Sequence, residues 1–225
     1  HHAEADSYRA LRPVRDHAFL LGITATPERQ DGRDVLEWCD WNVAYEVRLT
    51  EAIDRGWLLP FHYFGIADET VDFLQIPWRN LREVESALSV ESRVEQVLQH
   101  ALERGYDGDK RATVGFCAGR AHALYMAEQF RKRGHTAEAV LGDIAVNERE
   151  AIYARLADVT DPLEWFFVAD VLNEGVDIPA INSVLFLRPT ESSTLFLQQL
   201  GRGLRLCPGT DVLTVIDFVG HHRSA

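Results

Sequence analysis

Residues 112–169 read ATVGFCAGRAHALYMAEQFRKRGHTAEAVLGDIAVNEREAIYARLADVTDPLEWFFVA, and their pattern predicts the fold class. It holds three short and largely apolar runs, Ala112–Cys117, Glu138–Leu141 and Trp165–Ala169, separated by segments with helical spacing. Near-continuous apolar runs of this length are typical of parallel strands that are covered on both faces. The alternation of strand and helix therefore predicts an open parallel α/β sheet with right-handed crossovers.

The pattern extends outward on both sides of this stretch. Five further strands are predicted, at Ala18–Thr24, Tyr45–Leu49, Phe61–Ile66, Ser183–Arg188 and Val212–Phe218. Ser92 and Glu95 form an S-x-x-E capping box before one helix, and Asn147 is predicted to cap another. Gly134 is predicted to stop the helix between them. From about Ser89 to the C-terminus the alternation predicts a complete core.

The N-terminal part breaks this rhythm. Residues 45–89 mix short strands, a helix near Glu51–Arg55 and an acidic stretch at Asp68–Asp72, which indicates a connector. Residues 1–44 are too few for a domain and hold one strand, which ends in Thr24-Ala25-Thr26-Pro27. A lone strand leaves its backbone groups unpaired, so we expect the rest of its sheet to come from other sequence.

The composition is that of a globular protein, with 46% hydrophobic and 26% charged residues among 225. The net charge of −12 argues against a protein that coats nucleic acid by bulk charge, but not against a few local phosphate contacts. No signal-peptide or membrane-spanning pattern is present. Three widely spaced cysteines fit neither a disulfide framework nor a zinc site, which favours a reducing, cytoplasmic location and no metal site.

Residues 198–205 read QQLGRGLR and carry the strongest chemical pattern. On a helix, Leu200 and Leu204 fall on one face, whereas Gln198, Arg202 and Arg205 fall on the opposite face. An amide beside two guanidiniums suits a polyphosphate, because each guanidinium offers a planar fork of donors. The alternative is an ordinary solvated basic face.

Four segments resemble motifs of superfamily-two helicases, in the order and spacing of that family. Residues 198–205 resemble motif VI, and VADVLNEGVDIP at 168–179 resembles motif V. LGITATP at 21–27 looks like motif III, and VGFCAGRAH at 114–122 looks like motif IV. The overall resemblance is to bacterial DExH-type helicases of the UvrB-like and restriction-enzyme-like group. It is closest to the family often fused to a phospholipase-D-like nuclease, although no paired H-x-K motif occurs here.

The resemblance implies a RecA-like parallel sheet flanked by helices. Residues 1–44 would be the end of a first RecA-like domain, 45–89 a connector and 90–225 a complete second RecA-like domain. His1 would be the histidine of the DExH box, although His1 and His2 could instead be a tag remnant. The phosphate loop and the acidic residues of motif II are absent from these 225 residues. The chain alone is therefore expected to be inactive, with the magnesium ligands elsewhere.

The resemblance also assigns roles to individual residues. Arg202 and Arg205 would act as arginine fingers on ATP, with Gln198 near the γ-phosphate. Further ATP contacts would come from Gly175, Asp177 and His1. Nucleic-acid contacts, or coupling between domains, would come from Thr24, Thr26, Cys117, Ala118, Gly119, Ala169 and Asp170. His122 is predicted to be a helix-surface residue rather than a ligand.

The expected function is thus part of an ATP-dependent helicase or translocase, whose partners are nucleic acid and the rest of the parent helicase chain, and not a membrane. DNA is favoured over RNA. The alternative is a RecA-like module that binds nucleic acid or protein without hydrolysing ATP. A Rossmann-type enzyme is a weaker alternative, because no G-x-G-x-x-G follows the first strand of the predicted complete sheet.

Overall fold

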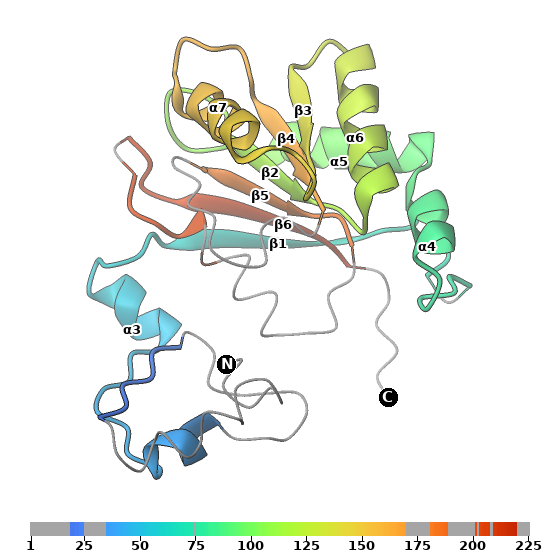
Figure 1. Ribbon diagram of the computed structural model, residues 1–225. Helices are drawn as coiled ribbons and strands as arrows, with labels where there is room; N and C mark the ends of the chain where they lie inside the picture. Colours follow the sequence, from blue (N-terminus) through green and yellow to red (C-terminus); the bar gives the residue numbers. More distant parts are fainter. Residues whose placement is uncertain are drawn as a thin grey trace.

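The computed structural model describes residues 19–24, 35–73, 75–169, 181–188, 201, 203–207 and 209–219. Within these ranges six parallel strands form one sheet in the order β1-β6-β5-β2-β4-β3 (Figure 1). The strands are β1 (Phe61–Ala67), β2 (Thr113–Phe116), β3 (Ala137–Val140), β4 (Trp165–Val168), β5 (Ser183–Phe186) and β6 (Leu213–Val219). This is the parallel α/β sheet that the sequence predicts.

Helices cover both faces of the sheet (Figure 1). On one face, α7 (Val146–Ala157) packs Tyr153 and Leu156 against Val114 and Phe116 of β2. On the other face lie α5 (Glu91–Arg104) and α6 (Arg120–Lys132), which pack against the alternate strand residues. Because both faces are covered, the central strands β2, β4 and β5 are buried along their whole length. None of the helices within the described ranges is long and apolar enough to cross a membrane.

Strand β1 completes one edge of the sheet. Phe61 to Ala67 pair in parallel with Leu213 to Val219 of β6. Just before the strand, the Leu213 amide donates to the Pro60 carbonyl at 2.9 Å. The range 45–89, which the sequence indicates as a connector, therefore contributes a strand to the main sheet. It also holds α3 (Leu49–Asp54), close to the predicted helix, and α4 (Leu81–Leu88).

Two predicted strands are wrong within the described residues. Residues 19–24 form no strand, and Phe19 and Ile23 are 93% and 90% exposed, so nothing described here covers them. Residues 45–48 form no strand either, and Leu49 begins α3 instead. Tyr45 is exposed, and no described strand pairs with this segment. A short 3-10 helix, η2 (Val35–Cys39), precedes this segment.

The predicted helix starts are also displaced, whereas the predicted stop at Gly134 is confirmed. The cap of α5 is Val90 rather than Ser92, and the cap of α7 is Ala145 rather than Asn147. Neither start carries a side-chain cap, because Ser92 and Asn147 already lie inside their helices. Gly134 lies just beyond α6 with a φ of 85°, a left-handed conformation that favours glycine.

Candidate functional site

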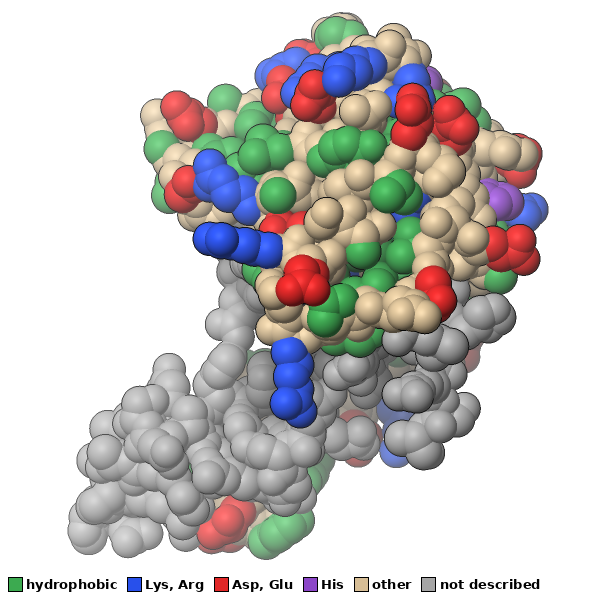
Figure 2. Space-filling model, turned by 90° about the vertical axis from the view of Figure 1, so that its right-hand side faces the viewer, with side chains coloured by type: hydrophobic (Ala, Val, Ile, Leu, Met, Phe, Trp, Pro, Cys, Tyr) green, Lys and Arg blue, Asp and Glu red, His purple; other side chains and the backbone are tan. Residues whose placement is uncertain are grey.

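All six strands are parallel, so their carboxyl ends meet at one edge of the sheet. In open α/β sheets this edge is where ligands bind. Here it gathers the residues that follow β1, β2, β4 and β5. Figure 2 views the molecule from the right-hand side of Figure 1, where Lys and Arg are interspersed with Asp and Glu rather than joined in one basic patch. Any phosphate contact on this surface therefore depends on individual groups.

The loop after β2 lies at this edge, as the sequence predicts. Cys117 and Ala118 are buried, and the Cys117 amide donates to the Val168 carbonyl at the end of β4 at 2.9 Å. Ala169 directly follows β4 and is buried in the same apolar cluster as Cys117. Burial raises the pKa of the Cys117 thiol, which therefore stays protonated. The fold thus brings Cys117, Ala118, Gly119 and Ala169 together.

A carboxylate occupies the start of α6. Glu85 of α4 accepts hydrogen bonds through Oε1 from the amides of Ala121 at 2.6 Å and His122 at 3.4 Å. Gly119 is the cap of α6 and has no side chain to offer, so Glu85 supplies the acceptor from another helix. The close approach requires glycine, since a Cβ on Gly119 would lie 2.8 Å from Glu85 Cδ. Two backbone amides at the start of α6 thus bind a carboxylate in this structure.

A buried arginine, Arg93 of α5, links three strand ends at the same edge. Its Nε donates to Asp68 Oδ2 at 2.6 Å, directly after β1. Its Nη2 donates to the Leu187 carbonyl at 2.9 Å, directly after β5. Its Nη1 lies 3.5 Å from His122 Nε2 on α6, which follows β2. Both side chains of the Arg93–Asp68 ion pair are fully buried.

His122 is the inner partner of this arginine, so its predicted place on the helix surface is wrong. The ring is fully buried, and its Nδ1 accepts a hydrogen bond from the Ala118 amide at 3.2 Å. Burial and the charge of Arg93 hold the pKa of His122 well below its usual range, so the ring is neutral. A neutral ring that accepts through Nδ1 carries its proton on Nε2. The approach of Arg93 is therefore a packing contact rather than a second hydrogen bond.

Sequence reasoning missed Arg93, Asp68 and Glu85. Arg93 adjoins the apolar stripe of α5, and burial alone lowers the pKa of its guanidinium while the Asp68 carboxylate raises it. No motif distinguishes these residues from solvated charges, and their partners lie far away in sequence. The signal that could have drawn attention to Arg93 is its position beside Val94, on the border of the buried face.

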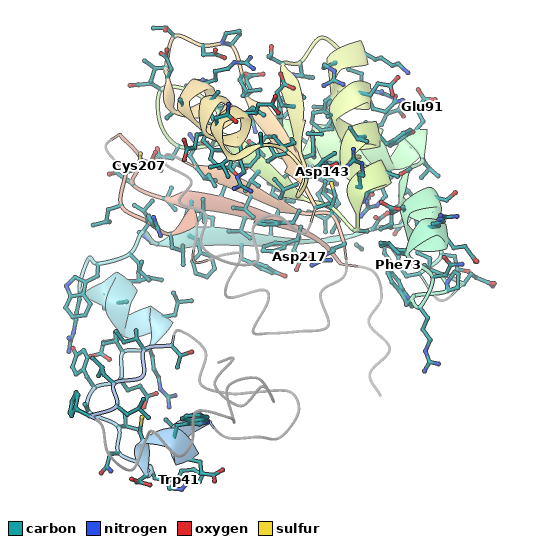
Figure 3. The ribbon with its side chains drawn as sticks, in the orientation of Figure 1. Trp41, Phe73, Glu91, Asp143, Cys207 and Asp217 are labelled. Atoms are coloured by element: carbon teal, nitrogen blue, oxygen red, sulfur yellow. The ribbon has the colours of Figure 1, made fainter. Side chains whose placement is uncertain are left out.

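The end of the predicted motif VI helix lies near the amino ends of the strands, on the side of the sheet opposite to the carboxyl edge. Gly201 and Gly203 are helical, whereas Leu204 and Arg205 already lie beyond the helix, so Arg205 does not continue it as predicted. The buried Leu204 accepts a hydrogen bond from the Leu59 amide at 2.8 Å, just before β1. In Figure 3, Cys207 lies at the opposite end of β6 from Asp217. The structure therefore does not bring exposed Arg205 close to the loop after β2.

Gly203 explains how this helix end sits so close to the sheet. A Cβ on Gly203 would lie 2.9 Å from Leu213 Cδ2 and 3.2 Å from Val184 Cγ2. Among the other predicted site residues, Thr24 is described and exposed. His1, Thr26, Asp170, Gly175, Asp177, Gln198 and Arg202 lie outside the described residues.

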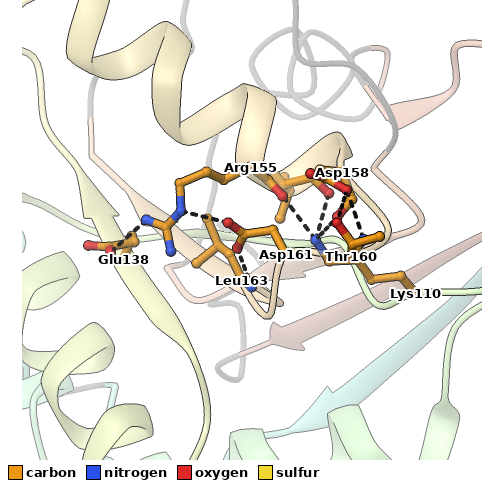
Figure 4. Close-up of polar contacts among 8 residues, drawn as sticks. Lys110, Glu138, Arg155, Asp158, Thr160, Asp161 and Leu163 are labelled. Carbon is orange, nitrogen blue, oxygen red and sulfur yellow. Dashed lines mark hydrogen bonds and ion pairs between the residues drawn. The ribbon is translucent and has the colours of Figure 1, made fainter.

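A second polar cluster lies at the amino edge and is not part of the candidate site (Figure 4). Lys110, before β2, donates through Nζ to the carbonyls of Arg155 at 2.9 Å and Asp158 at 2.6 Å. Arg155 in turn donates to Asp161 at 3.0 Å and Glu138 at 3.2 Å. These bonds satisfy the end of α7 and fix the chain before β4. The cluster therefore has a structural role, and substitutions in it can serve as controls for substitutions at the carboxyl edge.

Comparison with known proteins identifies relatives of this architecture. Residues 93–207 match the family model described as the helicase conserved C-terminal domain. IRC3 of Saccharomyces cerevisiae, assigned as an ATP-dependent helicase, is 28% identical over 98% of this chain and 33% of its own length. The type I restriction enzyme EcoKI endonuclease subunit of Escherichia coli is 33% identical over 43% of this chain and 9% of its own length.

A solved structure shows the same fold. It is a fragment assigned to the HsdR subunit of a type I restriction enzyme from Vibrio vulnificus. Its TM-score is 0.75 at 22% identity, over 97% of this chain and 43% of that one. This chain spans about one third of the length of IRC3 and of its relative in Schizosaccharomyces pombe, at 33% and 36%.

Proposed function

Because the chain belongs to the family of the helicase conserved C-terminal domain, we propose that it is the second RecA-like motor domain of an ATP-dependent nucleic-acid helicase or translocase. The observation that carries this proposal is where the match falls. Residues 93–207 include β2 to β5 of the parallel sheet and the loop Cys117-Ala118-Gly119 at its carboxyl edge. Sequence resemblance assigns motif IV to this loop, and its position at the carboxyl edge, where ligands bind in such sheets, supports the proposal.

The proposed nucleic-acid surface is the carboxyl edge. Ala118 and Gly119 are buried beside the Glu85 carboxylate, so the phosphate contact proposed at this edge falls to the exposed Arg120, which begins α6 beside them. Arg120 pairs with Asp143 at 2.5 Å, and both side chains are well exposed, so a phosphate can replace the carboxylate at little cost. DNA is the proposed nucleic acid, since the relatives include restriction-enzyme endonuclease subunits.

The proposed nucleotide contacts come from the motif VI segment. Arg205 and Arg202 would stabilise the charge that develops on the transferring phosphoryl group, with Gln198 near the attacking water. Gly175, Asp177 and His1 would complete the ATP contacts. Support for Arg205 comes from its surroundings, because the buried Leu204 anchors the chain on the sheet while Arg205 beside it is exposed. The magnesium ligands and the phosphate loop would come from the first motor domain.

Arg205→Ala in the full-length protein tests this proposal. Turnover of ATP with saturating single-stranded DNA should fall by about 10³- to 10⁵-fold, the scale of an arginine finger, while ATP affinity changes much less. Arg205→Lys should restore little, since an ammonium lacks the planar fork. Thermal melting should show both variants folded.

Arg104→Ala is the matched control. Arg104 is an exposed arginine at the C-terminal end of α5, and its guanidinium Cζ lies 4.9 Å from the centroid of the Phe64 ring. Its loss should leave turnover unchanged. Near-normal turnover in Arg205→Ala would remove this arginine from catalysis. Normal DNA binding without ATP hydrolysis by the wild type would favour a non-catalytic nucleic-acid-binding module instead.

A further inference from the structure

The fully buried Arg93–Asp68 pair is a costly way to stabilise a core. Removing two charges from water carries a desolvation penalty, and apolar residues of similar volume often stabilise a core equally well or better. Asp68 is further held by the Thr70 amide at 3.0 Å and the Thr70 hydroxyl at 2.5 Å, so its orientation is fixed. We therefore expect the ion pair to serve a role other than raising the free energy of unfolding.

The positions of the hydrogen-bond acceptors of Arg93 indicate this role. Its two hydrogen bonds end at the residues that follow β1 and β5, and its contact with His122 leads to the Ala118 amide after β2. The strands β1 and β5 are not neighbours, since β6 lies between them. Arg93 therefore joins the loops after β1 and β5, which the sheet does not join directly, whereas the loops after β2 and β5 follow neighbouring strands. All of these loops lie at the carboxyl edge.

We propose that Arg93 is a positioning residue that fixes the Leu187–Arg188 segment to Asp68 after β1 and, by packing against His122, to the motif IV loop. This inference rests on the proposed motor function. From Leu187 the chain continues through Arg188 towards motif VI, while Ala118 belongs to the proposed nucleic-acid surface. One planar guanidinium thus donates both to Asp68 and to the segment that leads to the proposed nucleotide contacts, and it packs against His122, which accepts from the Ala118 amide of the motif IV loop. A fork that donates in two directions does this, and an ammonium does not.

Substitutions at Arg93 and Lys110 in the full-length protein test the proposal. Arg93→Met alone leaves the Asp68 charge buried and unpaired, so Asp68→Asn/Arg93→Met is made as well and removes both charges. Lys110→Met is the control, because it breaks a comparable polar cluster at the opposite edge. We expect the double variant to lower kcat for DNA-stimulated ATP hydrolysis by about 10- to 100-fold, the cost of a small misplacement. The DNA concentration for half-maximal stimulation should rise.

Lys110→Met should lower the melting temperature at least as much as the double variant, yet keep kcat within about twofold of the wild type. Arg93→Lys should recover melting temperature more fully than kcat. Both results would separate positioning from stability. A double variant with wild-type kcat and half-maximal DNA concentration would overturn the proposal, as would a kcat that follows the melting temperature across all variants.

Amide hydrogen exchange on the same proteins tests the linkage independently of activity. The double variant should speed exchange both in the segment around Ala118–His122 and at Leu187–Arg188, while Lys110→Met should speed it near Arg155–Asp161. Faster exchange in only one of the two carboxyl-edge segments would overturn the proposal. If the wild type does not hydrolyse ATP, the proposed function fails, and the exchange pattern still decides whether Arg93 joins the two segments.

Discussion

At the scale of single residues, the tightest constraint is the contact between Gly119 and Glu85. The backbone of Gly119 is extended, with φ −170° and ψ −171°, which any residue can adopt. Space rather than conformation therefore requires glycine, because a Cβ would meet the Glu85 carboxylate that caps α6. The two positions should then depend on each other energetically.

We predict that Gly119→Ala lowers the free energy of unfolding by about 1–3 kcal/mol, because the added methyl pushes Glu85 off the amides of α6. Glu85→Ala should lower it by about 0.5–2 kcal/mol through the lost cap. The double variant should lose less than the sum, since the methyl then fills space that the carboxylate has left. Urea unfolding of the four proteins measures this cycle, and strictly additive losses would contradict the contact.

The sequence predicts the place of this loop but not the side chains that occupy it. Cys117, Ala118 and Gly119 follow an apolar strand, and the ends of parallel strands share an edge, so their position follows from local pattern. Glu85 and Arg93 reach their partners across 36 and 25 residues respectively, to Ala121 and Asp68. Such pairings depend on how helices pack, which periodicity does not encode. For the same reason His122 reads as a surface residue although the fold buries it.

At the scale of elements, the helix that carries motif VI offers a matched pair of glycines. Gly201 and Gly203 are both helical, but they face different surroundings. A Cβ on Gly201 would meet nothing within 4 Å, whereas one on Gly203 would meet Leu213 and Val184 of the sheet.

We predict that Gly201→Ala raises the free energy of unfolding by up to about 1 kcal/mol, since alanine favours the helix more than glycine does. Gly203→Ala should lower it by about 1–3 kcal/mol, because the methyl lifts the helix end off the sheet. Chemical denaturation of both variants distinguishes the two sites. Equal effects would mean that the helix end does not pack on β5 and β6 as described.

Strands were predictable from the sequence where both of their faces are buried, because such strands are apolar along their whole length. The strands β2 to β6 are covered by helices or neighbouring strands, so their apolar runs are sufficient signals. Tyr45–Leu49 alternates apolar residues with Glu46 and Arg48 and pairs with no described strand, and Leu49 starts α3 instead. The starts of α5 and α7 were not predicted correctly, because their cap residues, Val90 and Ala145, offer no side-chain hydrogen bond.

At the scale of the whole molecule, β1 changes where the domain begins. The alternating pattern predicts a complete core from about Ser89, yet β1 pairs along its full length with β6. The segment before it is fixed to motif VI through the Leu59 amide, and the residue after it, Asp68, neutralises Arg93. The stretch 57–68 is therefore part of the domain in space, although it lies outside the alternation in sequence.

We predict that a chain of residues 57–225 unfolds cooperatively and that one of residues 90–225 does not. The shorter chain leaves the backbone of β6 unpaired along one side. It also leaves the Arg93 charge buried without its carboxylate, which alone costs about 3–5 kcal/mol. Domains of this size are stable by only about 5–15 kcal/mol, so the remaining margin is small. Urea denaturation, followed by far-UV circular dichroism, measures the difference. Trp165 is buried and is the one tryptophan within residues 90–225, so Trp57→Phe and Trp78→Phe in the longer chain make its fluorescence comparable. Adding Asp68→Asn to residues 57–225 isolates the charge from the strand. If the midpoints of the two chains coincide, β1 is a peripheral strand and the domain begins at α5 after all.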